Sequence, residues 1–274
     1  MPQLEPTIAS DGLPARPTGK WVHAKKYYFS RYLDIMTHGV GPKWEGNLSY
    51  VDLFAGPGRS VIRGTGEEVE GSPVLSLRYE FARYVFVDLP EVLASLKSRL
   101  QDHPKLSQIS FVEGDCNAVI DDVKEKLPAD HLTLAFIDPT GLQIEFRTIH
   151  HLVKNRRMDL LMTIQFGMGI RRNLPQYIKT EGKRLTAFLG NAGWREDVSS
   201  GGLARGVLSR YLHELRGIGY RTVREREIDI HNDQNLLLYF IVLASRHTLG
   251  GKFWRGATQI EWSGQRRLDL GGGE

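Results

Sequence analysis

Apolar residues in the first two thirds of this chain form short continuous runs that alternate with amphipathic segments. Such runs predict strands buried on both faces, and the segments between them predict helices. Together they predict a parallel sheet with helices on both sides. The expected strands are 50–55, 84–88, 109–114, 132–138 and 160–166, and the expected helices are 75–83, 90–100, 119–126 and 149–154.

The last part of the pattern predicts a hairpin. Residues 220–230 alternate basic and acidic side chains, whereas 236–244 are strongly apolar. The connector 231–235 is too short for a crossover helix, so the two segments should pair antiparallel. The predicted fold class is therefore α/β: a Rossmann-like sheet of five parallel strands with a terminal antiparallel hairpin.

The remaining segments suggest one domain with additions. Residues 1–20 contain four prolines and few apolar anchors, which predicts a flexible tail. Residues 21–260 form the expected domain, with insertions at 60–73 and 167–219, and 261–274 form a C-terminal tail. Because both insertions follow strand ends, where α/β sheets bind ligands, they are candidates for a lid and a substrate-recognition element.

An amphipathic helix is expected at the start of the domain, where Trp21, Tyr28 and Tyr32 recur at helical spacing. Lys25 and Lys26 lie on it. They could face a phosphate or a carboxylate, or the helix could merely pack on the sheet.

Composition narrows the function classes only slightly. The 274 residues include 36 basic and 32 acidic side chains, a formal net charge of +4 that permits an anionic partner without requiring one. A single cysteine, Cys116, rules out an internal disulfide framework and a cysteine-only metal cluster. The nine histidines show no metal-ligand spacing, and no apolar run is long enough to span a membrane. We expect a soluble, cytoplasmic protein without a metal site.

The most informative motif is the stretch Tyr-Val-Asp-Leu-Phe-Ala-Gly-Pro-Gly at residues 50–58. An apolar run ends in an acid, and a glycine turn follows in which backbone amides can approach a ligand closely. Its form differs from the dinucleotide fingerprint Gly-x-Gly-x-x-Gly. It resembles the first motif of S-adenosylmethionine (SAM) dependent methyltransferases, especially those acting on bases in nucleic acids. The alternative is a strand-to-helix turn that binds no ligand.

That resemblance implies a set of site residues at four consecutive strand ends. The glycine turn would take the methionine end of SAM, Asp88 would accept the ribose hydroxyls, and Asp115 would lie near the adenine. Asp138 would face the methyl group and orient or deprotonate the acceptor. Taken alone, Asp115 could be a helix cap and Asp138 could begin a β-turn. The implied cofactor-binding residues are Asp52, Phe54, Ala55, Gly56, Pro57, Gly58, Asp88, Asp115, Cys116 and Asn117.

The residues after Asp138 bear on the acceptor. Methyltransferases of adenine amino groups carry an acid or asparagine, two prolines and an aromatic residue here. This chain keeps Asp138 and Pro139 but has Thr140 and Gly141 instead of the second proline and the aromatic. That difference weakens the case for amine methylation. An aromatic side chain from elsewhere in the chain could take the missing position and stack on the base.

Cytosine-C5 methylation is the other base chemistry to consider, and it needs a cysteine nucleophile near the fourth strand end. Cys116 follows the third strand instead, so we interpret it as an apolar wall residue of the adenine pocket.

Beyond single motifs, residues 20–260 resemble the three-Cys-motif partner protein family (TcmP). The shared features include Gly-Ser-Pro at 71–73, Gly-Asp-Cys-Asn at 114–117, Phe-Ile-Asp-Pro-Thr-Gly-Leu at 136–142, and Ala-Ser-Arg-His at 244–247. The resemblance implies a methyltransferase-like fold and association with a separate three-cysteine protein that looks like a radical-SAM iron–sulfur enzyme. Having one cysteine, this chain would be the partner and not the cluster carrier.

We therefore expect a class I SAM-dependent methyltransferase that acts on nucleic acid. The expected substrate-binding residues are Pro139, Thr140, Gly141, Arg171 and Arg172; the two arginines belong to the basic excursion after the fifth strand. Two alternatives remain open. One is a methyltransferase of a small molecule or protein, and the other is a catalytically silent SAM-fold subunit that positions a partner.

Overall fold

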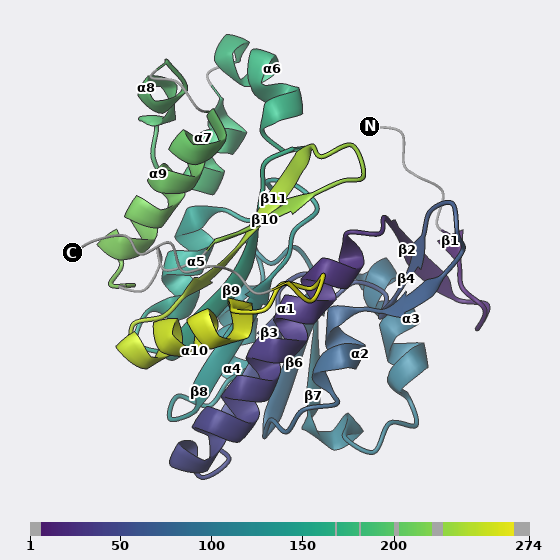
Figure 1. The fold of residues 1–274 in the computed structure, drawn as a ribbon. Coiled ribbons are helices and arrows are strands. Elements are labelled where there is room, and N and C mark those ends of the chain that lie inside the picture. The colour runs from purple at the N-terminus through teal and green to yellow at the C-terminus, as the bar shows by residue number, and fades with distance from the viewer. Residues whose placement is uncertain (1–6, 168, 181, 200–202, 221–226, 266–274) are drawn as a thin grey trace.

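A seven-stranded sheet forms the centre of the computed structural model, which describes residues 7–167, 169–180, 182–199, 203–220 and 227–265 (Figure 1). In spatial order its strands are β10 (Ile228–His231), β11 (Leu237–Ala244), β9 (Arg157–Gln165), β8 (Leu132–Ile137), β3 (Leu48–Asp52), β6 (Arg83–Asp88) and β7 (Ile109–Glu113). The last five are mutually parallel, whereas β11 runs antiparallel to β9 and β10 antiparallel to β11. This arrangement confirms the predicted fold class.

The strand order creates a switch point. From β3 the chain proceeds outward to β6 and β7, then crosses back to β8 on the other side of β3. Asp52 at the end of β3 therefore lies between Phe86 of β6 and Phe136 of β8. Ligands of open α/β sheets bind in the crevice where the strand order reverses, at the carboxyl ends of the strands.

Successive side chains of each central strand point alternately into two hydrophobic cores, one on each face of the sheet. Tyr50 packs on one face of the sheet with residues of α1, α3 and α10, and Val51 packs on the other with residues of α4, α5, α7 and α9. Both strand residues are fully buried, which explains why the sequence shows continuous apolar runs. The helices on the first face are α1 (Val22–Asp34), α2 (Ser72–Ser76), α3 (Pro90–Leu100) and α10 (Thr248–Thr258); those on the second are α4 (Ile120–Lys126), α5 (Phe146–Val153), α7 (Lys183–Leu189) and α9 (Leu203–Gly217).

The excursion between β9 and the hairpin is helical. Besides α7 and α9 it contains η4 (Arg171–Asn173), α6 (Leu174–Lys179) and α8 (Trp194–Ser199). Tyr211 and Leu215 of α9 are buried against the sheet, so part of this segment completes the core. Shorter helices elsewhere are η1 (Ile35–Val40), η2 (Gly41–Trp44) and η3 (Leu106–Gln108).

One sequence-based expectation near the N-terminus is wrong, because residues 7–18 of the expected flexible tail form β1 (Thr7–Ile8) and β2 (Pro14–Thr18). The expected insertion 60–73 overlaps β4 (Arg59–Ile62) and includes β5 (Glu68–Glu70). These four strands make a second sheet in the order β1-β2-β4-β5. The prolines suggested a loose tail, but the pairing partner of β2 lies more than forty residues away, where local pattern cannot indicate it.

Smaller differences concern element ends. The helix expected at 75–83 is instead α2, which ends at Ser76, and α10 was not predicted as a helix. Of the first hairpin strand, 221–226 lie outside the described residues, as do 1–6 and 266–274 of the two predicted tails.

Candidate functional site

The glycine turn begins where β3 ends. The backbone N–H of Phe54 donates to Asp52 Oδ1 at 3.2 Å, and that of Ala55 donates to the Val87 carbonyl at 3.0 Å. Gly56 and Gly58 have φ angles of +69° and +86°, a region that favours glycine.

The two glycines serve different purposes. A Cβ on Gly58 would lie 2.7 Å from Leu96 Cδ1, so this residue lets α3 pack closely on the turn. A Cβ on Gly56 would first meet the guanidinium of Arg16, with Nη2 at 3.3 Å. Gly56 therefore faces a flexible polar side chain of the cleft lining, not the packed core.

Asp52 is a fully buried carboxyl group. Tyr50 Oη donates to its Oδ2 at 3.1 Å, and the Ser72 side chain also hydrogen-bonds to it. Burial nevertheless dominates and raises the pKa of Asp52 to about 7, because a charged carboxylate loses hydration there.

Asp88, which ends β6, lies against the glycine turn. Its Oδ2 accepts from the Gly56 N–H at 2.8 Å, and its Oδ1 accepts from the Leu89 N–H at 2.9 Å. Arg16 Nη2 is 3.8 Å from Oδ2. The structure thus brings together the predicted ribose acid and the predicted turn.

The predicted adenine-side residues follow β7. Asp115 Oδ1 accepts from both the backbone N–H and Nδ2 of Asn117, at 2.9 Å each. Asn117 also donates to the Gln143 carbonyl at 2.8 Å, and its Oδ1 accepts from the Glu145 N–H at 3.0 Å. These side chains join two loops. The alternative of a helix-capping Asp115 is wrong, because the N-cap position of α4 is Val119. Contact of residues 115–117 with a cofactor stays a prediction.

Cys116 is buried, and burial raises the pKa of its thiol to about 12. The thiolate needed for nucleophilic attack is therefore strongly disfavoured. This environment fits the interpretation of Cys116 as an apolar wall residue.

Asp138, which follows β8, is already engaged at both oxygens. Lys25 Nζ donates to Oδ2 at 2.5 Å, and Thr163 Oγ1 donates to Oδ1 at 2.7 Å. Only 9% of its side chain is exposed. The sequence pattern placed Lys25 on a helix, but it did not identify Asp138 as its partner.

The chain bends at Thr140 and Gly141, shortly after Asp138. Pro139 is buried, Thr140 is exposed, and Gly141 is half-buried. Thr140 Oγ1 accepts from Gln143 Nε2 at 2.6 Å. Their assignment to substrate binding stays a prediction.

A cleft runs from the glycine turn to Asp138. Arg16, Lys25, Lys26 and Arg59 surround it with positive charge, and burial lowers the pKa of Lys26. The part of the chain that sequence analysis missed is β2, which supplies Arg16 and Thr18. The lining consists of Arg16, Thr18, Val22, Lys25, Lys26, Phe29, Ala55, Gly56, Pro57, Gly58, Arg59, Ser60, Glu70, Gly71, Ser72, Leu75, Phe136 and Asp138.

A further polar group lies near Asp138. The buried hydroxyl of Tyr239 has no hydrogen-bond partner among the described residues, and Lys25 Nζ lies 6.0 Å from the centre of its ring. The negative charge of Asp138 adds to burial in raising the pKa of Tyr239 far above its ordinary value. Its position in an apolar strand gave no signal of this environment.

Arg171 and Arg172 lie in η4, shortly after the carboxyl end of β9, and both are exposed. Among the described residues, no hydrogen bond or ion pair joins their side chains to the cleft lining, so their substrate contact stays a prediction. Within the described ranges, no cluster of three or more histidine, cysteine or acidic side chains could hold a metal ion. None of the described helices has the length and apolarity needed to cross a membrane.

Comparison with known proteins supports the fold. No protein-family model and no curated protein matches the sequence. A crystal structure of a Legionella pneumophila protein of the DUF519 family matches with a TM-score of 0.54 and 12% identity, covering 91% of this chain and 95% of that one. At this identity the match shows similarity of fold alone.

Other similar structures have lower scores. Fibrillarin from Aeropyrum pernix, in complex with S-adenosyl-L-methionine, has a TM-score of 0.40 and 11% identity, covering 72% of this chain and 65% of that one. An O-methyltransferase family protein from Burkholderia thailandensis has a TM-score of 0.39 and 12% identity, covering 78% and 58%. These two scores are too low to carry a conclusion. The chain has a Rossmann-like α/β fold, with the five parallel strands and the terminal antiparallel hairpin that its sequence predicted.

Proposed function

We propose that this chain is a SAM-dependent methyltransferase. The observation that carries the proposal is the hydrogen bond between the Gly56 N–H and Asp88 at the switch point of the sheet. It joins the glycine turn to a strand-end acid, with Asp138 at the end of the strand on the other side of β3. A nucleoside cofactor needs this combination of close backbone approach and a carboxylate for ribose hydroxyls.

The residues present fit SAM. Gly56 lines the cleft without a side chain of its own, and Asp88 has further lone pairs for hydroxyl donors. Bound SAM would supply an activated methyl group, and the chain would align the acceptor and exclude water.

Asp138 would orient the acceptor or take its proton. Because Lys25 and Thr163 occupy its two oxygens, Lys25 would have to leave Oδ2 or share it with the acceptor. The Lys25–Asp138 ion pair is therefore the arrangement of the site before an acceptor binds.

We further propose nucleic acid as the acceptor. One support is the motif at residues 52–58, which resembles that of base methyltransferases. The other is a group of exposed cations in and around η4, α6 and α7. They follow β9, so they lie toward the same edge of the sheet as the glycine turn. The exposed cations are Arg171, Arg172, Lys179, Lys183 and Arg184.

We also propose a three-cysteine radical-SAM-like partner. The support is the resemblance to the TcmP family, together with the single buried cysteine of this chain. Copurification of the two proteins from a co-expressing cell would test the association.

A catalytically silent SAM-fold subunit is the second candidate. The doubly engaged Asp138 favours it, because a carboxylate held by Lys25 and Thr163 is not free to accept a proton. A methyltransferase of a small molecule or protein would share the cofactor site and differ only in its acceptor.

Cofactor binding is the first test. We expect mass spectrometry of the purified chain to detect SAM or S-adenosylhomocysteine, and calorimetry to give a measurable affinity. Asp88→Ala should weaken SAM binding on the order of 2–4 kcal/mol, through loss of two charge-assisted hydrogen bonds. Glu113→Ala is the matched control, because Glu113 is an exposed strand-end acid paired with Lys97. Equal affinities of the two variants would contradict the assignment of Asp88.

Transfer is the second test, with labelled SAM and bulk RNA or DNA. Transfer to either nucleic acid supports the proposed acceptor. If SAM binds but no label is transferred to nucleic acid, the small-molecule, protein or silent-subunit function is favoured.

A further inference from the structure

The N-terminal segment 7–18, here called the arm, pairs with chain that follows the glycine turn. Arg16, Pro17 and Thr18 of β2 lie parallel to Ser60, Val61 and Ile62 of β4, and β1 extends the same small sheet. Figure 1 shows β1, β2 and β4 together at one side of the central sheet. The arm is thus attached directly to the loop that forms the candidate cofactor site.

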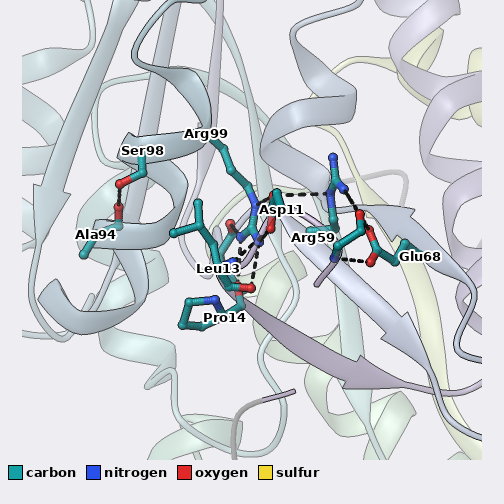
Figure 2. Close-up of polar contacts among 10 residues, drawn as sticks. Asp11, Leu13, Pro14, Arg59, Glu68, Ala94, Ser98 and Arg99 are labelled. Atoms are coloured by element: carbon teal, nitrogen blue, oxygen red, sulfur yellow. Dashed lines mark hydrogen bonds and ion pairs between the residues drawn. The ribbon is translucent and has the colours of Figure 1, made fainter. Parts of the chain in front are cut away.

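Arg99 of α3 locks the arm in place. Its Nε and Nη2 donate to the two carboxylate oxygens of Asp11, at 2.7 and 2.9 Å, and Nη2 also donates to the Leu13 carbonyl at 3.1 Å (Figure 2). Its Nη1 donates to the carbonyls of Pro14 at 2.8 Å and Pro57 at 2.5 Å. All five guanidinium donors are therefore used.

The hydrogen bonds of Arg99 join the arm to the glycine turn, because Pro57 lies between Gly56 and Gly58. The Arg99 side chain is only 7% exposed. Its hydrogen bonds to Asp11 are the largest influence that lowers the pKa of that carboxyl group to about 2. The pair is consequently ionised under ordinary conditions.

The side chain of Arg16 extends from the arm into the cleft. Its guanidinium lies over Gly56 and lines the cleft, with Nη2 at 3.8 Å from Asp88 Oδ2. That separation is too long for a hydrogen bond. Among the described residues the guanidinium makes no hydrogen bond, and 32% of its side chain is exposed. Its donors are thus directed into a polar site and available to a ligand.

We propose that the arm is a wall of the cofactor site and that Arg16 is a further cofactor-binding residue. Ribose hydroxyls that donate to Asp88 can accept hydrogen bonds from Arg16, because a hydroxyl is both donor and acceptor. Arg99 is a positioning residue that holds Arg16 through Asp11 and the arm carbonyls. This inference rests on the proposed SAM-binding function and deepens it.

Calorimetry with S-adenosylhomocysteine tests the inference on the full chain. Arg16→Met keeps much of the apolar stem and removes the donors, and we expect it to weaken binding at least tenfold with an unchanged melting temperature. Arg63→Met is its control, because Arg63 is exposed just beyond β4 and is not part of the cleft lining. Arg99→Met should weaken binding to a similar extent, whereas Lys97→Met on the same helix should not.

A ribose analogue separates contact from structural support. With 2′-deoxy-S-adenosylhomocysteine, which lacks one hydroxyl, the effect of Arg16→Met should shrink to about threefold or less. Asp11→Asn offers a second route to a loosened arm that leaves α3 intact, and it keeps the test valid if Arg99→Met does not fold.

The outcomes are distinguishable. If the unaltered chain binds neither SAM nor S-adenosylhomocysteine, the proposed function fails, and the inference fails with it. If the unaltered chain binds and Arg16→Met binds equally well or more tightly, only the inference is overturned. An equal loss for the normal and the deoxy ligand would also overturn the assigned ribose contact.

Discussion

At the scale of single residues, the site combines two buried carboxyl groups in different electrostatic settings. Asp138 is paired with the ammonium of Lys25, whereas Asp52 accepts hydrogen bonds from Tyr50 and from the Phe54 N–H. Burial raises the pKa of Asp52 to about 7, and the nearby carboxylate of Asp138 adds to that rise.

Asp138 is expected to act at the transfer step. Asp138→Ala should leave SAM affinity within about threefold and reduce transfer to bulk RNA or DNA about a hundredfold or more, as for loss of a positioned general base. Both quantities should be measured on one preparation by calorimetry and label transfer. Asp130→Ala, at an exposed loop acid, is the control. Full transfer by Asp138→Ala would remove the residue from the mechanism.

Asp52 is expected to make stability depend on pH. Its carboxyl pKa rises from 3.8 to about 7 on folding, so below about pH 4 both states hold the proton. Between pH 4 and 7 the unfolded state loses its proton first, and the free energy of unfolding falls as pH rises. Ionising the buried group costs on the order of a few kcal/mol once the pH exceeds 7.

The measurement is urea unfolding from pH 5 to 8. The stability of Asp52→Asn relative to the unaltered chain should rise across this range. Asp130→Asn should show no such trend. A flat difference for Asp52→Asn would mean that the native carboxyl group titrates at its ordinary pKa.

At the scale of elements, the glycine turn is shaped by β3, α3 and the arm together. Gly58 is required by packing against Leu96, and Gly56 lies against the guanidinium of Arg16. Gly64 provides a comparison, because it has a φ angle of +86° in the β4–β5 connection and nothing within 4 Å of a built Cβ.

Gly56→Ala should weaken SAM binding at least tenfold, whereas Gly64→Ala should not. Both substitutions place alanine at positive φ, at a cost of about 1–2 kcal/mol, so similar losses of stability are expected. Thermal melts check the shared strain, and calorimetry checks the difference in binding. Normal SAM affinity in a folded Gly56→Ala variant would show that the turn is only structural.

At the scale of the whole molecule, the parallel strands bring distant loops to one edge of the sheet. The glycine turn, Asp138 and η4 follow β3, β8 and β9, which are neighbours in that sheet. A long anionic acceptor could therefore contact η4 while one of its bases reaches the cleft. Backbone phosphates would supply most of that affinity.

Replacing Arg171 and Arg172 by alanine should weaken binding of bulk single-stranded RNA. The slope of log affinity against log salt should fall by about 0.7 for each phosphate that the variant no longer binds. Arg83 and Lys154, which are exposed near the opposite edge of the sheet, form the control pair. Fluorescence titrations at several salt concentrations give the slopes. An unchanged slope in the first variant would exclude the two arginines from the interface.

The sequence by itself determined the central sheet. Its five parallel strands were predictable because each is buried on both faces and therefore apolar along its length. The placement of Asp88 beside the glycine turn was also predictable, since carboxyl ends of neighbouring parallel strands share an edge. Both features follow from the local hydrophobic pattern and from the connection rules of α/β sheets, which leave few possible strand orders.

Only the tertiary structure decided which distant groups meet at that edge. The Lys25–Asp138 pair spans 113 positions of the chain, and the Arg99–Asp11 pair spans 88. Asn117 joins two loops, and the arm that looked loose from its prolines pairs with β4. Contacts between polar side chains far apart in sequence leave no periodic signal, because they arise only once the packed sheet and helices set the distances between them.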